Sequence, residues 1–299
     1  MQETHENPEN LISLNNLCLL AKVSRSGYYA WKSGKTYPLT KDEKDIADFQ
    51  LILEAYSFRG YDKGVMGIYM RLLRMGIRMN HKKIRRIMRK FDLHCPIRKS
   101  NPYRKMMRAM KTNAVADNHL NREFKQYGPR KVFLTDITYI PFNGKFCYLS
   151  VIKDAYTNEI LSNVLSENLE VDFVLETVEN LINNHGIEIN SKAMIHSDQG
   201  SHYTSTSFIE LLNSYELRQL MSRRGNCWDN PPQESFFGHL KQELVPYAQQ
   251  WTCFEEIKSR IDDWIDYYNN DRFQMGLEKL TPKEFYYYST TGINPGELN

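Results

Sequence analysis

Residues 131–165, KVFLTDITYIPFNGKFCYLSVIKDAYTNEILSNVL, carry the clearest signal of the fold in this sequence. Three β-rich runs follow one another in this stretch, over residues 131–140, 145–155 and 158–165. Asn143-Gly144 lies between the first two runs, and this dipeptide is a strong hairpin signal because both residues tolerate a positive φ. Consecutive strands joined by short turns predict an antiparallel meander of three strands.

Downstream of the meander the chain alternates helices and strands. Residues 170–184 have apolar side chains at helical spacing, and the pattern ends at Gly186. Residues 193–198 and 217–222 are short runs typical of strands, and residues 206–215 between them have a helical pattern. Three strands followed by alternating helices and strands predict an α/β protein, with a mixed sheet flanked by helices.

The residues ahead of the sheet are predicted to be helical. Residues 11–32 fit two short helices, with Ser24 able to cap the second, and residues 41–57 fit a longer charged helix. A clearer pair follows, formed by residues 66–75 and by a helix that begins after Asn80. We therefore expect small all-α helix-turn-helix modules before the α/β core.

Positive charge is concentrated in one block of the chain. Residues 61–111 contain sixteen Lys and Arg residues and two acids, which is a formal charge of +14 in a chain whose total is +3. The helix after Asn80 has one apolar stripe, and basic side chains cover its other faces. They include Lys82, Lys83, Arg85, Arg86 and Arg89. A basic amphipathic helix after a turn is typical of a DNA-docking unit whose Lys and Arg contact phosphates, and a solvated helix packed on its neighbour is the alternative.

Composition argues against several other classes of protein. The chain has 299 residues, 41% of them hydrophobic. It contains no apolar run of about 18 residues, so a membrane span is not expected. Its first residues are polar and acidic and do not resemble a signal segment, which predicts a cytoplasmic protein. The five cysteines are scattered and form no C-x-x-C pair, so neither a disulfide framework nor a thiolate zinc site is indicated.

Three acidic residues lie where carboxylates can do chemistry. Asp136 interrupts an apolar strand, a position that disfavours Asp unless it binds a metal or lies at a solvated edge. Asp198 follows a strand and precedes a Gln-Gly turn, where it either lines a crevice or only forms the turn. Glu234 follows Asn230 and two prolines, with Gln233 completing a capping-box-like pattern. This predicts that Glu234 lies in the first turn of a helix, where it can also simply complement the positive helix end.

The spacing of these acids resembles a known signature. Thirty-five residues separate Asp198 from Glu234, and Asp136 precedes both, as in the D, D-35-E pattern of retroviral integrases and insertion-sequence transposases. The flanking blocks also resemble the second-frame transposase of the insertion sequence three family. These blocks are KVSRSGYYAWKSG, NHKKIRRIMRKFDL, LTDITYI, IHSDQGSHYTS, MSRRGNCWDNPPQESFFGHLKQEL and YYNNDRFQMGLEKLTPKEF. The resemblance covers nearly the whole chain and implies a ribonuclease H-like catalytic core.

The resemblance implies a DNA transposase that nicks and joins strands at insertion-sequence ends. Asp136, Asp198 and Glu234 are then the catalytic residues and the metal ligands, holding two Mg²⁺ or Mn²⁺ ions, because hard cations prefer carboxylate oxygens. Water first frees a 3′-hydroxyl, which then attacks a second phosphodiester. Lys241 lies two helical turns after Glu234 and is implied to contact the DNA end, although on physical grounds alone it is a solvated lysine.

Partners and domains also follow from the resemblance. The partners are the terminal inverted repeats, target DNA, further copies of the chain on DNA, and a first-frame product that supplies the leucine-heptad coiled coil missing here. The expected domains are an N-terminal helical region (1–58), a basic helix-turn-helix-like DNA-binding module with a linker (59–115), and an integrase-type core with C-terminal helices (116–290). A nuclease of the same fold that cuts without joining, and a non-catalytic DNA-binding regulator, are the alternatives.

Overall fold

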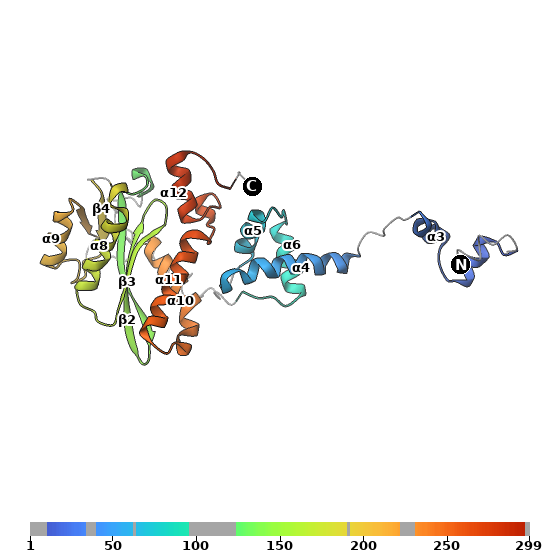
Figure 1. The fold of residues 1–299 in the computed structure, drawn as a ribbon, viewed down its shortest axis with the longest axis horizontal. Coiled ribbons are helices and arrows are strands. Elements are labelled where there is room, and N and C mark those ends of the chain that lie inside the picture. The colour runs from blue at the N-terminus through green and yellow to red at the C-terminus, as the bar shows by residue number, and fades with distance from the viewer. Residues whose placement is uncertain are drawn as a thin grey trace, which may run out of the picture. The chain divides into compact units, whose positions relative to one another are not determined.

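The computed structural model describes residues 11–33, 40–61, 64–95, 124–189, 192–221 and 231–296. The chain divides into two compact units, Met1–Gln50 and Leu51–Asn299. Figure 1 shows their elements, coloured along the chain. Residues 96–123, where the linker of the predicted 59–115 module lies, and residues 222–230 are outside the described residues.

Two of the helices ahead of the sheet begin at the caps that the sequence predicts. They are α2 (Leu14–Leu20), α3 (Arg25–Lys32), α4 (Lys41–Ser57), α5 (Val65–Arg74) and α6 (His81–Lys90). The Ser24 hydroxyl accepts a hydrogen bond from the Gly27 N–H at the start of α3, and the Asn80 side-chain oxygen accepts one from the Lys82 N–H at the start of α6. Each cap satisfies an amide that the helix itself leaves without a partner.

A five-stranded mixed sheet lies at the centre of the second unit. Its strands are β1 (Val132–Phe142), β2 (Lys145–Asp154), β3 (Ile160–Ser166), β4 (Met194–Ser197) and β5 (Arg218–Met221), in the order β3-β2-β1-β4-β5. The first three strands pair antiparallel, and Asn143 and Gly144 both have positive φ in the hairpin, so the predicted meander is confirmed. β4 runs parallel to β1, and β5 runs parallel to β4. This is the mixed sheet that the residue patterns predict, in the ribonuclease H-like arrangement that the resemblance implies.

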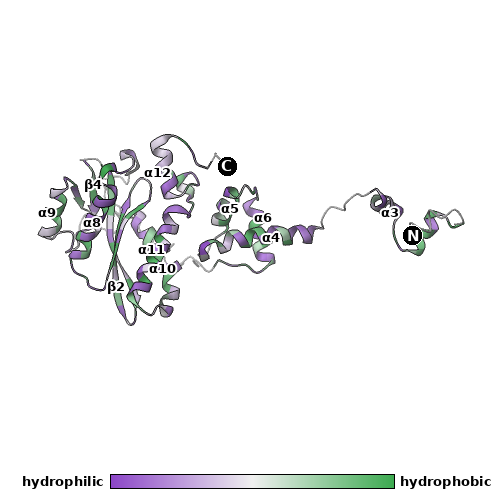
Figure 2. Ribbon diagram, in the orientation of Figure 1, coloured by the Kyte–Doolittle hydropathy of each residue, from purple (hydrophilic) through white to green (hydrophobic). Residues whose placement is uncertain are grey.

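Helices cover both faces of this sheet (Figure 1). α8 (Asp172–His185) and α9 (Thr206–Ser214) lie on one face, and α10 (Pro231–Leu244) and α11 (Phe254–Asn270) lie on the other. The remaining elements are α12 (Pro282–Thr291) and the short 3₁₀ turns Phe58–Gly60, Phe124–Tyr127, Gly186–Glu188, Val245–Gln250 and Met275–Leu277. Hydrophobic and hydrophilic residues alternate along the helices, as expected when one side packs on the sheet (Figure 2). None of the helices within the described ranges is long and apolar enough to cross a membrane.

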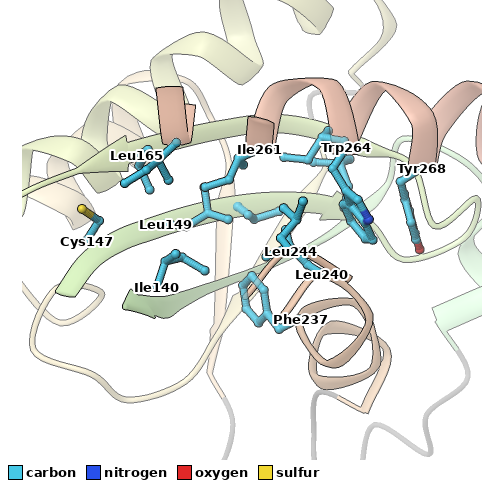
Figure 3. Packing of buried hydrophobic residues seen from close by; sticks show 14 of the residues in the cluster. Ile140, Cys147, Leu149, Leu165, Phe237, Leu240, Leu244, Ile261, Trp264 and Tyr268 are labelled. Atoms are coloured by element: carbon cyan, nitrogen blue, oxygen red, sulfur yellow. The ribbon is translucent and has the colours of Figure 1, made fainter. Parts of the chain in front are cut away.

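The alternation of side chains along the strands produces two apolar cores. On one face, Ile140 of β1 packs in a cluster with Leu240 of α10 and Trp264 of α11 (Figure 3). On the other face, Ile152 of β2 packs in a cluster with Phe208 of α9. The first core packs α10 against one face of the sheet, and the second packs α8 and α9 against the opposite face. This packing fixes α10, which carries Glu234, relative to the strands.

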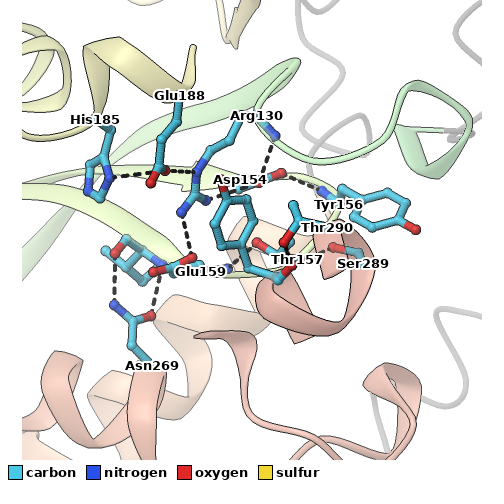
Figure 4. Close-up of polar contacts among 12 residues, drawn as sticks. Arg130, Asp154, Tyr156, Thr157, Glu159, His185, Glu188, Asn269, Ser289 and Thr290 are labelled. Atoms are coloured by element: carbon cyan, nitrogen blue, oxygen red, sulfur yellow. Dashed lines mark hydrogen bonds and ion pairs between the residues drawn. The ribbon is translucent and has the colours of Figure 1, made fainter. Parts of the chain in front are cut away.

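A buried ion-pair network stabilises one end of the sheet (Figure 4). Arg130, which precedes β1, donates to Asp154 at 3.2 Å, to Glu159 at 2.8 Å and to Glu188 at 3.1 Å. The Arg130 N–H also donates to Asp154. A buried guanidinium is unfavourable unless carboxylates face it, and three do so here. The network therefore anchors the end of β2 to the start of β1.

Candidate active site

The pairing of β1 with β4 brings two of the predicted acids together. These strands run parallel, and Leu134 lies beside His196. Two residues further along each strand come Asp136 and Asp198. Because parallel strands advance by the same rise per residue, both carboxylates reach the same level at the end of this strand pair.

Asp136 lies within β1, opposite Val151 of β2. Its side chain points to the face that α10 covers, because it has the same parity along β1 as Ile140, a member of the core on that face. Its Oδ1 accepts a hydrogen bond from the Ile137 N–H at 2.8 Å. The strand interior therefore holds this carboxylate in a fixed position.

Asp198 lies in a turn directly after β4 and is exposed. Its Oδ1 accepts a hydrogen bond from the Gly200 N–H at 2.8 Å. A Cβ added at position 200 would lie 2.9 Å from that oxygen, so a side chain there would displace the carboxylate or the backbone. Asp198 therefore does form the turn, and the strand register also sets it beside Asp136.

Glu234 lies in the first turn of α10, as predicted, and its side chain is exposed. The helix begins with Pro231 and Pro232, whose missing N–H groups would have no partner in the first turn in any case. The amide of Gln233 is fully buried and has no hydrogen-bond partner among the described residues, which do not include the expected cap. Asn230 lies outside them. The turn instead buries Gln233 and leaves Glu234 open to solvent.

Electrostatics link the three carboxylates. The pKa of Asp136 is raised to about 7, first by burial and then by the negative charges of Asp198 and Glu234. No group of three or more His, Cys, Asp or Glu side chains in the described part of the chain is close enough to hold a metal ion. The two exposed carboxylates are nevertheless within Coulombic reach of Asp136, so a cation bound among the three would be compensated by negative charge.

Lys241 adds a positive charge to this environment. It lies on α10 two helical turns after Glu234. Burial lowers the pKa of Lys241, and the negative charge of Asp136 acts in the opposite direction. Lys241 and Asp136 therefore interact electrostatically, as expected if Lys241 lies on the same side of α10 as Glu234.

Tyr203 lies next to the candidate site, on the opposite face of the sheet from the Asp136 carboxylate, and the sequence interpretation did not single it out. Its hydroxyl is buried and lies 3.4 Å from the Thr135 hydroxyl, on the residue before Asp136. Burial raises the pKa of Tyr203 well above its usual value, and the charge of Asp136 adds to this effect. Its one sequence signal was its position five residues after Asp198 in the block IHSDQGSHYTS.

The predicted DNA-binding face of α6 is solvent-accessible. The helix buries Ile84, Ile87 and Met88 along one stripe. The other faces carry the exposed side chains of Lys82, Lys83, Arg85, Arg86 and Arg89. The structure therefore separates the apolar and basic faces as the sequence predicts, and it does so on an element distinct from the three acids.

Family models match three segments of the chain. Two models of the integrase core domain match residues 126–227 and 234–288, and a model of an HTH-like domain matches residues 42–101. The protein InsK for insertion sequence element IS150 of Escherichia coli K12 is 32% identical, over 91% of this chain and 93% of its own length. The transposase InsF for insertion sequence IS3A of the same organism is 24% identical, again over 91% of this chain and 93% of its own. The chain belongs to the insertion sequence three family of transposases. The transposase is therefore a polynucleotidyl transferase of DNA integration, with an integrase core and an HTH-like domain.

A solved structure also resembles the transposase. The catalytic core domain of BIV integrase is 16% identical, with a TM-score of 0.43, and the similarity covers 55% of the transposase and 97% of that domain.

Proposed function

We propose that Asp136, Asp198 and Glu234 hold two divalent ions, Mg²⁺ or Mn²⁺, with which the transposase nicks and joins DNA strands at the ends of its element. The main support is that the β1–β4 register sets Asp198 beside Asp136. In addition, the negative charge of Glu234 on α10 is close enough to raise the pKa of the same buried carboxyl. Three carboxylates without His or Cys fit a hard cation with oxygen ligands. These residues therefore suit the ions that the family resemblance implies.

The residues have separate roles in this proposal. Bound divalent ions supply activation of the attacking oxygen and stabilisation of the leaving oxygen in an in-line displacement. Asp136 is the rigid member of the set, because β1 and the Ile137 N–H hold it. Glu234 is exposed on a first helical turn, so its rotamer can adapt, whereas the Gly200 N–H holds the exposed Asp198 carboxylate on its turn. Lys241 contacts a phosphate of the DNA end through a charge-assisted hydrogen bond.

The proposal includes partners and domains. The transposase binds the terminal inverted repeats of its element and the target DNA, and several copies of the chain assemble on this DNA. A first-frame product supplies a coiled coil for multimerisation. Residues 1–58 form the N-terminal helical region, residues 59–115 the DNA-binding module and linker, and residues 116–290 the catalytic core. α6, with its exposed basic side chains, is the part of the 59–115 module that contacts phosphates.

Joined products are the direct test of the proposed reaction. The transposase, alone and fused to a first-frame product, is incubated with labelled element-end DNA and Mg²⁺ or Mn²⁺. Metal-dependent nicking followed by strand joining is expected. Cleavage without joining would instead assign a nuclease, and end binding without either reaction would assign a regulator.

Neutralising part of α6 should weaken DNA binding and flatten its salt dependence. Removal of one phosphate contact lowers the slope of log K against log salt by about 0.9, so replacing Lys82, Arg85 and Arg89 together by Gln should remove up to roughly 3 units of slope. Fluorescence anisotropy with labelled end DNA at several salt concentrations measures this. The matched control replaces three exposed basic residues on other helices by Gln, namely Lys258 and Arg260 of α11 and Lys283 of α12. Equal slopes for the two triple variants would contradict the assignment of α6.

Gly200→Ala should impair cleavage by moving Asp198. The new Cβ would lie 2.9 Å from the Asp198 carboxylate, and displacement of a reacting group by about 1 Å costs roughly 10²-fold in rate. We expect a loss of about 10- to 100-fold in the initial cleavage rate, with a folded protein by circular dichroism. Gly276→Ala is the control, because a Cβ there meets nothing within 4 Å. If both variants cleave equally well, the position of Asp198 does not limit the reaction.

A further inference from the structure

Lys153 is a buried lysine on the face of the sheet that α10 and α11 cover. It is the next-to-last residue of β2 and is 2% exposed. It has the same parity along the strand as Val151, which belongs to the core shared with α10 and α11. An amine in such surroundings is unfavourable, and an apolar side chain of similar length would avoid its desolvation. A local violation of this kind is expected at positions with a function.

The Lys153 side chain connects the sheet to the first turn of α10. Its Nζ donates to the carbonyl oxygen of Pro232 at 2.9 Å. Pro232 precedes Glu234 by two residues. On the strand side, Lys153 pairs with Leu134, which precedes Asp136 by two residues on β1. One hydrogen bond therefore links the strand pair that carries Asp136 to the helical turn that carries Glu234.

The strand end of this connection is held firmly. Asp154, the next residue, accepts hydrogen bonds from the Arg130 N–H and guanidinium in the buried network. Burial lowers the pKa of Lys153 to about 7, while Asp154 acts in the opposite direction. The bond to Pro232 needs a single N–H, so the neutral amine and the ammonium both form it.

We propose that Lys153 is a positioning residue that sets the place of Glu234 relative to Asp136. The proposal rests on the function proposed above, in which those two carboxylates hold metal. Apolar contacts, such as those of Phe236, press α10 onto the sheet but are non-directional. A hydrogen bond has a preferred length and angle, so it defines where along the strand the first turn lies.

A contact with DNA is the competing role for Lys153. Lys153 also lines a cavity of about 550 Å³ with Arg272 and His239. However, the Arg272 guanidinium is held by Glu243 through bonds of 2.6 and 2.8 Å, so the cavity offers little uncompensated positive charge for a phosphate. The hydrogen bond to Pro232 is therefore the stronger guide to the role of Lys153.

Lys153→Met tests the proposal through metal binding and hydrogen exchange. The variant keeps the length of the side chain and loses the donor. We expect the Mn²⁺ concentration for half-maximal thermal stabilisation to rise roughly 10-fold or more, as when a group orienting a metal ligand is lost. Hydrogen exchange should quicken in peptides covering the start of α10. The control is Thr177→Val, which removes a buried hydrogen bond to the Phe173 carbonyl in α8, on the opposite face of the sheet.

The outcomes separate this proposal from its rivals. Lys153→Met with wild-type Mn²⁺ dependence and α10 exchange would overturn it, whatever the loss of stability relative to Thr177→Val. Weaker DNA binding with unchanged Mn²⁺ dependence would overturn it in favour of the phosphate contact. If Mn²⁺ stabilises Asp136→Asn as much as it stabilises the wild type, the proposed metal site is wrong. Hydrogen exchange in α10 of Lys153→Met then still decides whether Lys153 holds the turn. Lys153→Gln, too short to reach Pro232, carries the same test if methionine prevents folding.

Discussion

Asp136→Asn, Asp198→Asn and Glu234→Gln should each reduce nicking and joining of element ends by roughly 10³-fold, about 4 kcal/mol of transition-state stabilisation. Each change keeps the shape of the side chain and removes one negative charge from the metal-holding set. Loss of one preorganised electrostatic group typically costs about 10²- to 10³-fold, and a lost metal ligand acts on both the attacking and the leaving oxygen. The rates of nicked and joined product formation from labelled end DNA measure the effect.

The chain offers a matched control for Glu234. Glu255 is also an exposed glutamate in the first turn of a helix, at the start of α11. If Glu234 only complements the helix dipole, Glu234→Gln and Glu255→Gln should have the same effect, a stability change of about 0.3–1 kcal/mol with joining intact. A catalytic role predicts loss of joining for Glu234→Gln alone, with DNA binding retained. Joining within about tenfold of wild type for any of the three acid variants would contradict the triad.

Asp136→Asn should stabilise the metal-free transposase at alkaline pH. The pKa of Asp136 is raised from its ordinary value of 3.8 to about 7 in the folded chain, chiefly by burial. Between these values the folded state binds more protons than the unfolded state, so this carboxyl's contribution is most favourable below the unfolded pKa. Stability is lost as the pH rises from the unfolded pKa to the folded pKa, and the loss is complete above the folded pKa. A pKa shift of about 3 corresponds to a loss of up to about 4 kcal/mol in the free energy of unfolding. The Asp136→Asn variant avoids this loss because asparagine does not ionise.

Chemical denaturation with a chelator present measures this effect. The free energy of unfolding of the wild type should fall between about pH 4 and about pH 7 and level off above, while that of Asp136→Asn should change much less. Added Mn²⁺ should restore the stability of the wild type at the higher pH, because a bound cation favours the ionised carboxylate. The same pH dependence in both proteins would show that Asp136 titrates normally and would remove one support for a metal site.

Several elements of the fold could be predicted because their signals are local. The Asn143-Gly144 turn needs two residues at positive φ, and this dipeptide supplies them at low cost. Ser24 and Asn80 cap α3 and α6 through hydrogen bonds that span two or three residues. The apolar stripe of α6 follows from helical periodicity alone. Strand ends differ from the predicted ones by a residue or two, because tertiary pairing decides where a strand stops.

The candidate site was predictable in part. The order and spacing of Asp136, Asp198 and Glu234 identified them, because the family signature is written in the chain itself. Gly200 carried a weaker signal as part of a turn. Tyr203 had only its place in the block after Asp198 as a signal, and no residue pattern distinguishes Lys153 from an ordinary core position.

Residue types and their spacing were enough to predict the order of strands and helices along the chain, two of the caps, the basic face of α6 and three candidate acids. These depend on residue type, spacing and short-range hydrogen bonds. The folded structure was needed to show that the parallel register of β1 and β4 sets Asp198 beside Asp136, and that Lys153 reaches Pro232. Contacts between residues about 60 to 80 positions apart arise from the packing of the whole sheet and its helices, which no local pattern encodes.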